Sequence, residues 1–424
     1  MNRAVLWSAV ERALPRVTSA IILVIFAALA APAVVGLYFT ATLAVTFLQS
    51  SFDLSMRQYA VGLVGDQRGL RIIRRFQIVY LSCGAALVLF VLTAIFFSEP
   101  AQGLNVAGLL PLALVPVFGA LAIRAVATLQ KANRWRRLAR FQALATLFGI
   151  CVGLPALVLT GSPLGPALSA ATAEGVFTIA AIVGSRRVAA AVRIDEESDA
   201  SALQGFAAVS ATSVVTWFQL NLDRLLIVML AGPALLGLYA VAWAVARSAA
   251  DAVVAASANV LRPALFMLQD SNVPGSESVR FDSVMKTSAS IVFAGGVAII
   301  VGAKFAQPLF LDPSWDDAID AIPVVVALTV PSLVEALLGV VLVTRRKGNR
   351  LLPVKVVSVV LAIPIGFAAT LGLEIAAWVA VGRQVVTLVA MIAITPGVIS
   401  RSSGVLISLL IAAQLSCAAA LGLI

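Results

Sequence analysis

The chain has no histidine among its 424 residues. Histidine is the commonest metal ligand and the usual proton carrier near neutral pH, so its absence excludes a histidine-based catalytic triad or zinc site. Only three cysteines are present, Cys83, Cys151 and Cys417, and we expect each to be a small buried side chain in an apolar helix. No glycine-rich loop ends in Lys-Ser or Lys-Thr, which excludes a Walker-type ATP site. We predict no enzyme, no metal and no bound cofactor.

Charged residues are also scarce, at 12% of the chain, whereas hydrophobic residues make up 61%. Apolar runs of about 20 residues recur along the whole length, and each can cross a hydrocarbon core about 30 Å thick. We predict an all-α, polytopic integral membrane protein with about 13 transmembrane helices. They lie near 17–35, 37–64, 76–98, 106–130, 138–160, 165–185, 203–231, 235–265, 287–310, 320–344, 351–371, 375–397 and 404–424.

Basic residues occur in alternate loops. With the N-terminus in the cytoplasm, 24 of the 30 Lys and Arg residues fall in inside segments and none in outside loops. The positive-inside rule therefore predicts a cytoplasmic N-terminus. The net charge of +10 reflects this orientation and does not indicate a nucleic-acid partner. The other six basic residues lie within predicted spans: Arg57, Arg124, Arg224, Arg247, Lys304 and Arg383.

A short sequence repeats at a fixed offset of 201 residues. Pro32-Ala33-Val34-Val35-Gly36-Leu37-Tyr38 returns as Pro233-Ala234-Leu235-Leu236-Gly237-Leu238-Tyr239. Six spans per half restore the same sidedness, so the repeat is parallel, and two similar halves in a membrane are typical of transporters. We predict two pseudo-symmetric six-helix lobes, residues 1–195 and 196–400, followed by an additional membrane segment at 401–424. A charged linker with Asp195 and Glu196 joins the lobes.

Two predicted spans carry polar stripes at helical spacing. The second has Thr42, Thr46, Gln49, Asp53 and Arg57. The seventh has Thr212, Thr216, Gln219 and Asp223, with Arg224 about 100° away around the helix. A charge at mid-membrane costs about 2.5–3.5 kcal/mol on the insertion scale, so such groups face the protein interior or a wet cavity.

Arg247 and Asp251 form an i, i+4 pair in the eighth predicted span, as do Asp53 and Arg57 in the second. Taken alone, each pair could be a structural ion pair that locks helices together. The stripes favour a water-filled cavity lined by spans 2, 7 and 8, because a dry helix contact needs no polarity over several turns.

Guanidinium groups suit an anionic cargo, because they bind phosphate oxygens through two parallel hydrogen bonds and stay charged at low dielectric. Threonine, glutamine and carboxylate groups suit sugar hydroxyls. The predicted substrate-binding residues are Arg57, Arg224, Arg247, Arg383, Asp53, Gln49, Gln219 and Thr216. Without an ATP site, transport depends on an ion gradient, the membrane potential or the cargo's own gradient. The candidate carboxylates for coupling to H⁺ or Na⁺ are Asp223, Glu174, Glu335 and Asp251.

An outside loop contains Asp312-Pro313-Ser314-Trp315 followed by further acids. Asp312 and Pro313 are typical of a helix N-cap and first helical position, and acids in a first turn suit the helix dipole. We expect Trp315 to be an interfacial aromatic anchor rather than part of a catalytic site.

The segment Leu222-Asp223-Arg224-Leu225-Leu226-Ile227, with Ala231-Gly232-Pro233 and Gly237-Leu238-Tyr239 after it, resembles the signature of the polysaccharide-biosynthesis flippases. These belong to the multidrug/oligosaccharidyl-lipid/polysaccharide (MOP) exporter superfamily. Gly36-Leu37-Tyr38 with Asp53 and Arg57 is similar to the family pattern in the first half, and the resemblance covers about residues 10–400. Relatives usually have twelve or fourteen spans, and the thirteenth segment here departs from that pattern.

The resemblance implies a V-shaped pair of lobes whose spans 1, 2, 7 and 8 line a central cavity. It implies a flippase that carries polyprenyl-diphosphate-linked oligosaccharide across the bacterial inner membrane by alternating access, for lipopolysaccharide or exopolysaccharide synthesis. Expected partners are that lipid-linked oligosaccharide, membrane lipids, the polysaccharide polymerase and the chain-length machinery. By position, the family's functional residues match Arg57, Asp223 and Arg224.

Two other classes remain open. A MATE-like multidrug or organic-cation antiporter would share the fold but should expose uncompensated carboxylates in its cavity, whereas six basic residues meet five acids within the predicted spans here. A membrane-embedded polymerase or glycosyltransferase should carry a large catalytic loop outside the membrane, and no outside loop is long enough.

Overall fold

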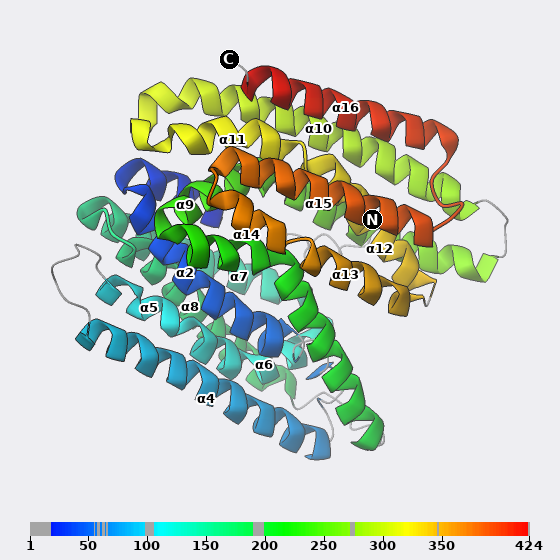
Figure 1. Ribbon diagram of the computed structural model, residues 1–424. Helices are drawn as coiled ribbons and strands as arrows, with labels where there is room; N and C mark the ends of the chain where they lie inside the picture. The colour runs from blue at the N-terminus through cyan, green and yellow to red at the C-terminus, as the bar shows by residue number, and fades with distance from the viewer. Residues whose placement is uncertain are drawn as a thin grey trace. The chain divides into compact units, whose positions relative to one another are not determined.

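The computed structural model describes residues 18–54, 56, 60–61, 64, 67–97, 106–189, 199–271, 276–345 and 347–422. Every element in these ranges is helical (Figure 1), which confirms the predicted all-α class. The contacts divide the chain into two compact units, Met1–Phe218 and Gln219–Ile424. The predicted lobe boundary at 195–196 lies outside the described residues and stays a prediction, as does the V-shaped arrangement.

The first unit contains the helix Thr18–Leu29, α2 (Pro32–Leu48), the π-helix η1 (Gln49–Leu54), α4 (Gln67–Phe97), the 3₁₀ turn η3 (Val106–Leu109), α5 (Leu110–Ala113), α6 (Val115–Lys131), α7 (Trp135–Thr160), α8 (Leu164–Ala189) and the start of α9 (Asp199–Ser271). Glycines let α7 and α8 approach closely. A Cβ on Gly153 would lie 2.4 Å from the Cβ of Ser169, and one on Gly165 would lie 2.4 Å from the Cβ of Leu157. Small residues at such crossings are typical of membrane helices.

The second unit contains the rest of α9, α10 (Ser276–Phe310), the 3₁₀ turn η4 (Pro313–Trp315), α11 (Asp316–Val326), α12 (Thr329–Thr344), the 3₁₀ turn η5 (Gly348–Arg350), α13 (Leu351–Val360), α14 (Ile363–Ala369), α15 (Leu373–Ile394) and α16 (Arg401–Gly422). Helix α12 is the centre of its core, with Leu333, Leu337 and Val341 fully buried. The C-terminal α16 packs along α10 and α11 (Figure 1). Its buried Gln414 donates a hydrogen bond of 3.2 Å to Thr329 Oγ1 at the start of α12.

The chain reverses direction inside α9, at Gly232. This glycine has φ 85° and ψ 174°, a conformation that residues with a Cβ avoid. Tyr239 bonds the side chain of Asp223, although sixteen residues of straight helix would place them about 24 Å apart. The two arms of α9 therefore lie side by side and correspond to the predicted spans 203–231 and 235–265.

Among the described residues, ten helices are long and apolar enough to cross a membrane, and counting the bent pair α11–α12 as one span gives eleven. This count treats Ala211–Ser248 as one span and omits the shorter apolar helix Thr18–Leu29. Helix is present in each of the thirteen predicted ranges, but the number thirteen is not confirmed.

Two expectations about single side chains are wrong. Trp315 is 1% exposed and so is no interfacial anchor: the turn η4, capped by an Asp312 side chain that accepts from the Ser314 N–H at 2.9 Å, directs the indole into the core. The cysteines are not buried as expected: Cys83 and Cys417 are half-buried, and Cys151 is exposed. It lies on the apolar face of α7 that also presents Leu147 and Phe148. The predicted N-cap role of Asp312 is confirmed.

Candidate functional site

The two arms of α9 are joined by a buried carboxylate. Asp223 is 0% exposed, and its Oδ2 accepts a hydrogen bond of 2.8 Å from the Tyr239 hydroxyl. Its Oδ1 accepts a hydrogen bond of 2.9 Å from the Arg224 backbone N–H. A carboxylate is tolerated in an apolar interior when such donors satisfy it. The buried hydrogen bond between Asp223 and Tyr239 therefore holds the two arms of α9 together.

Two arginines approach one indole ring on the same hairpin. The Cζ of Arg224 lies 5.9 Å from the centroid of Trp243, and the Cζ of Arg247 lies 5.3 Å from it. Tyr239 stacks on the same indole at 5.4 Å and 28°. Each cation–π contact contributes about 0.5–2 kcal/mol. We call Arg224, Trp243 and Arg247 the guanidinium cluster.

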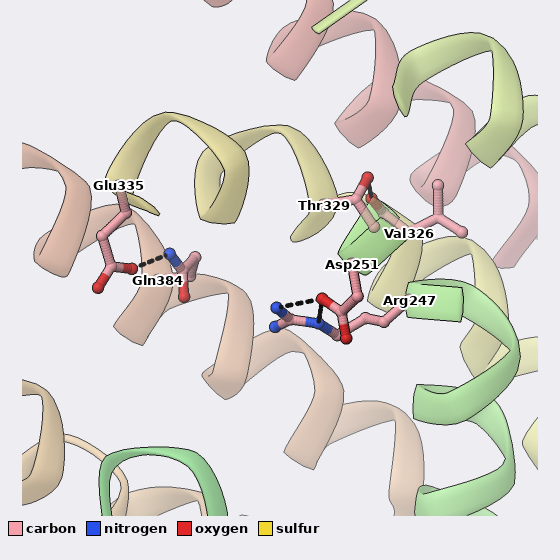
Figure 2. A network of polar contacts seen from close by, with 6 residues as sticks. All are labelled: Arg247, Asp251, Val326, Thr329, Glu335 and Gln384. Atoms are coloured by element: carbon pink, nitrogen blue, oxygen red, sulfur yellow. Dashed lines mark hydrogen bonds and ion pairs between the residues drawn. The ribbon is translucent and has the colours of Figure 1, made fainter. Parts of the chain in front are cut away.

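The two guanidinium groups differ in how they are compensated. Arg247 pairs with Asp251 at 3.1 Å (Figure 2), which confirms the predicted i, i+4 pair. Among the described residues, the guanidinium of Arg224 donates one long hydrogen bond, of 3.5 Å to the Asn221 side chain, and its buried Nε has no acceptor. A buried charged N–H without an acceptor is costly, and two cations at one ring repel each other. An anion bound between them would relieve both costs.

A second cluster of polar residues is centred on Gln219, one helical turn before Asp223 on α9. The two carboxylate oxygens of Glu335 accept hydrogen bonds from Gln219 at 3.1 Å and from Gln384 at 2.6 Å. Figure 2 shows Glu335 on α12 and Gln384 on α15 pointing toward each other. Arg383, which is 8% exposed, donates to the backbone carbonyl of Gln219 at 3.2 Å. Gln219 thus connects Glu335 with Arg383.

The remaining predicted site residues belong to the first unit. Gln49 begins the π-helix η1, Thr216 donates to the Thr212 carbonyl at 2.7 Å, and Glu174 is half-buried on α8. The Asp53 side chain and the whole of Arg57 lie outside the described residues. The structure therefore brings together only the predicted site residues of the second unit. That the residues of the first unit belong to the same site remains a prediction.

Sequence reasoning missed three residues of this site: Tyr239, Trp243 and Gln384. A signal for the first two was present, because Tyr239, Trp243, Arg247 and Asp251 recur at every fourth position and so share one face of a helix. Gln384 carried no such signal, since only the packing of α15 against α12 brings it to Glu335.

Solved structures that are similar to this chain include membrane transporters and a flippase. An inward-facing multidrug resistance MATE family transporter of the MOP superfamily matches with a TM-score of 0.66 and 13% identity, over 95% of this chain and 98% of the other. Lipid II flippase MurJ in an inward closed conformation matches with a TM-score of 0.65 and 12% identity, over 99% and 97%. A MOP superfamily transporter from Pyrococcus furiosus matches with a TM-score of 0.56 and 14% identity, over 96% and 95%.

The apolar helices and the fold define the class: a multi-pass membrane protein with the fold of MOP superfamily transporters. No curated protein matches the sequence. The profile of the family described as polysaccharide biosynthesis protein matches residues 75–320, more than half of the chain. The protein belongs to this polysaccharide-biosynthesis family, as predicted. The fold neighbours named above are transporters and a flippase rather than enzymes.

Proposed function

We propose that the protein is a flippase that moves polyprenyl-diphosphate-linked oligosaccharide from the inner to the outer leaflet of the bacterial inner membrane, for surface polysaccharide synthesis. The observation that carries this proposal is the guanidinium cluster, where Arg224 and Arg247 approach one indole and the buried Nε–H of Arg224 has no acceptor in the part of the chain that the structure describes. A diphosphate supplies the acceptor oxygens and negative charge that such a cluster lacks.

Family and fold support this choice of cargo. The family is one of polysaccharide biosynthesis, and the neighbour MurJ is a flippase of lipid II, by its name a lipid substrate. In our proposal the cluster holds the diphosphate, neighbouring amides and hydroxyls hold sugars, and the polyprenyl tail stays in lipid. The N-terminus is cytoplasmic, and the flipped product passes to the polymerase and chain-length machinery.

The coupling step belongs to the same proposal. Alternating access is driven by an H⁺ or Na⁺ gradient acting on one of four carboxylates, Asp223, Glu174, Glu335 or Asp251. These groups have different surroundings, since Asp223 is completely buried and bonded to Tyr239, whereas the Asp251 side chain is 43% exposed. Asp251 is therefore the easier of the two for an ion in water to reach.

Deletion of the gene in its host, followed by a leaflet-resolved assay of lipid-linked oligosaccharide, tests the proposal. We expect the intermediate to accumulate on the cytoplasmic face and to return to normal when the wild-type gene is restored. An unchanged pool together with new sensitivity to drugs would instead support the multidrug or organic-cation antiporter.

Two substitutions test the arginines directly. We expect Arg57→Ala and Arg224→Ala to abolish transport while the amount of protein in the membrane stays normal. Arg224→Ala removes a cation from the guanidinium cluster, and Arg57 is the arginine that the family resemblance matches in the first half. Polymer output and a membrane immunoblot are the measurements. Wild-type polymer output from both variants would contradict the binding role.

A further inference from the structure

A polar pocket lies within the second unit, apart from the guanidinium cluster. It has a volume of about 250 Å³ and is formed by α12, α13 and α15. Glu335 and Lys355 line it together with apolar side chains such as Val340 and Met391. A pocket with one acid, one base and apolar walls suits a small ligand that carries a charge as well as hydroxyl groups.

The carboxylate in this pocket is held in a fixed orientation. Amides on two different helices, Gln219 on α9 and Gln384 on α15, each donate to one oxygen of Glu335. An ionised carboxylate has about four acceptor positions, so two amide donors leave capacity for further donors. Sugar hydroxyls are such donors. A metal cation is a poor fit, because the polar neighbours of Glu335 present N–H groups rather than oxygen ligands.

On the proposed orientation, the pocket begins near the cytoplasmic ends of its helices. Lys355 is five residues from Arg350 at that end, or about 7 Å at 1.5 Å per residue. Glu335 is ten residues from Arg345, or about 15 Å, which is half of a hydrocarbon core about 30 Å thick. Phospholipid headgroups do not reach that depth, whereas the headgroup of a transported lipid must cross it.

Gln219 links this pocket to the guanidinium cluster. Its side chain bonds Glu335, its carbonyl accepts from Arg383, and it precedes Arg224 by five residues of the same helix, about 7 Å. A diphosphate at the cluster therefore places the sugars attached to it about one to two helical turns away, at the distance of the pocket.

We propose that this pocket is the sugar-specificity subsite of the transporter and takes an acidic monosaccharide of the cargo. Glu335 accepts hydroxyl groups of the ring, and the ammonium of Lys355 pairs with the sugar carboxylate. The volume is below the range of 300–1,000 Å³ typical for drug-sized ligands, so the pocket holds one sugar rather than a chain. This inference rests on the proposed flippase function and adds the class of sugar and the residue that selects it.

The test uses the full-length protein in liposomes and two probes. Both are short-chain polyprenyl-diphosphate disaccharides with a fluorescent label, and they differ in one sugar, a glucuronic acid or a glucose. Flipping is followed by quenching of the probe in the outer leaflet. We expect the wild type to move the acidic probe about tenfold faster, since one charge-assisted contact worth about 1.4 kcal/mol is a factor of ten.

Variants at Lys355 separate selectivity from folding. Lys355→Gln should reduce the acidic-to-neutral ratio to about one, whereas Lys355→Arg, which keeps the charge, should retain most of it. Lys286→Gln is the matched control, because Lys286 lies on α10, bonds Ser402 on α16 and does not line the pocket. We expect it to keep the wild-type ratio.

The outcomes are distinguishable. Equal transport of both probes by the wild type, or a Lys355→Gln variant that keeps the wild-type ratio, overturns the specificity subsite while the flippase function stands. A Lys355→Gln variant that loses both probes equally assigns Lys355 a structural role and also overturns it. Transport of neither probe by the wild type overturns the proposed function, and the subsite falls with it.

Discussion

The 201-residue repeat relates two hairpins, the helix Thr18–Leu29 with α2 and the two arms of α9, which share a proline and a tyrosine but differ in chemistry. In the first, Tyr38 packs edge-on against Phe26 at 5.8 Å, and the positions matching Asp223 and Arg224 are the buried apolar residues Ile22 and Leu23. In the second, Tyr239 donates its hydroxyl to the buried Asp223. One hairpin is held by apolar packing and the other by a hydrogen-bonded carboxylate.

The difference extends along the second arm. Trp243, Arg247 and Asp251 have Thr42, Thr46 and Ser50 as their counterparts 201 residues earlier. At these matched positions the ionic side chains therefore occur only in the second copy. The apolar residues of the repeat serve the helix packing that both halves need, whereas the cations at these positions belong to one of them.

In this comparison, the largest difference is expected between two single variants. One removes a cation from the second hairpin, and the other removes the matching residue from the first. Arg247→Ala should lower transport about 10- to 100-fold, since a charge-assisted hydrogen bond is worth about 1.5–3 kcal/mol. Thr46→Ala, its counterpart in the first hairpin, should change transport less than about threefold. Initial flipping rates in liposomes measure both. Equal losses would show that the two hairpins contribute alike.

The next effect concerns the turn. Gly232→Ala should destabilise the protein by about 1–3 kcal/mol, because alanine avoids φ 85° with ψ 174°. At the matching position, Ala31 has φ −67° and ψ 153°, so Ala31→Gly should cost below about 1 kcal/mol, through chain entropy alone. Thermal unfolding in detergent compares the two. A Gly232→Ala variant as stable as wild type would contradict the strained turn.

The two tyrosines give a smaller contrast. Tyr239→Phe should cost about 1–3 kcal/mol, because it leaves the buried Asp223 carboxylate without one of its two donors. Tyr38→Phe keeps the ring contact with Phe26 and should cost about 1 kcal/mol or less. The same unfolding assay measures both variants, and a larger loss for Tyr38→Phe would reverse the comparison.

The smallest expected effect concerns Asp312, which lies outside both hairpins and serves as a reference for the comparison. The Ser314 backbone N–H and hydroxyl lower the pKa of Asp312 below its ordinary value. A lowered folded-state pKa means that the stabilisation is fully present above the unfolded pKa of about 3.9 and is lost as pH falls through the folded one. The small difference in Tm between wild type and Asp312→Ala should therefore be constant above about pH 5 and vanish in acid. A difference that persists in acid would contradict this.

Much of the fold could be predicted from the sequence, because apolar runs, loop charges and the repeat can be read without knowing which helices touch. The reversal at Gly232-Pro233 and the Arg247–Asp251 pair follow from residues close in sequence. The bend of 46° between α11 and α12 could not be predicted, since the apolar sequence continues through it. The burial of Trp315 and the convergence of Gln219 and Gln384 on Glu335 depend on contacts between distant helices.

The loopless reversal in α9 has a practical consequence for work on this protein. Because Gly232 is the one non-helical residue inside α9, this reversal offers no loop for a protease to cut or for an epitope tag to occupy. An insertion there would separate Asp223 from Tyr239 and part the arms. Reporters of sidedness therefore belong in the stretch after α15, where Pro396 and Gly397 leave the helix before α16 begins at Arg401.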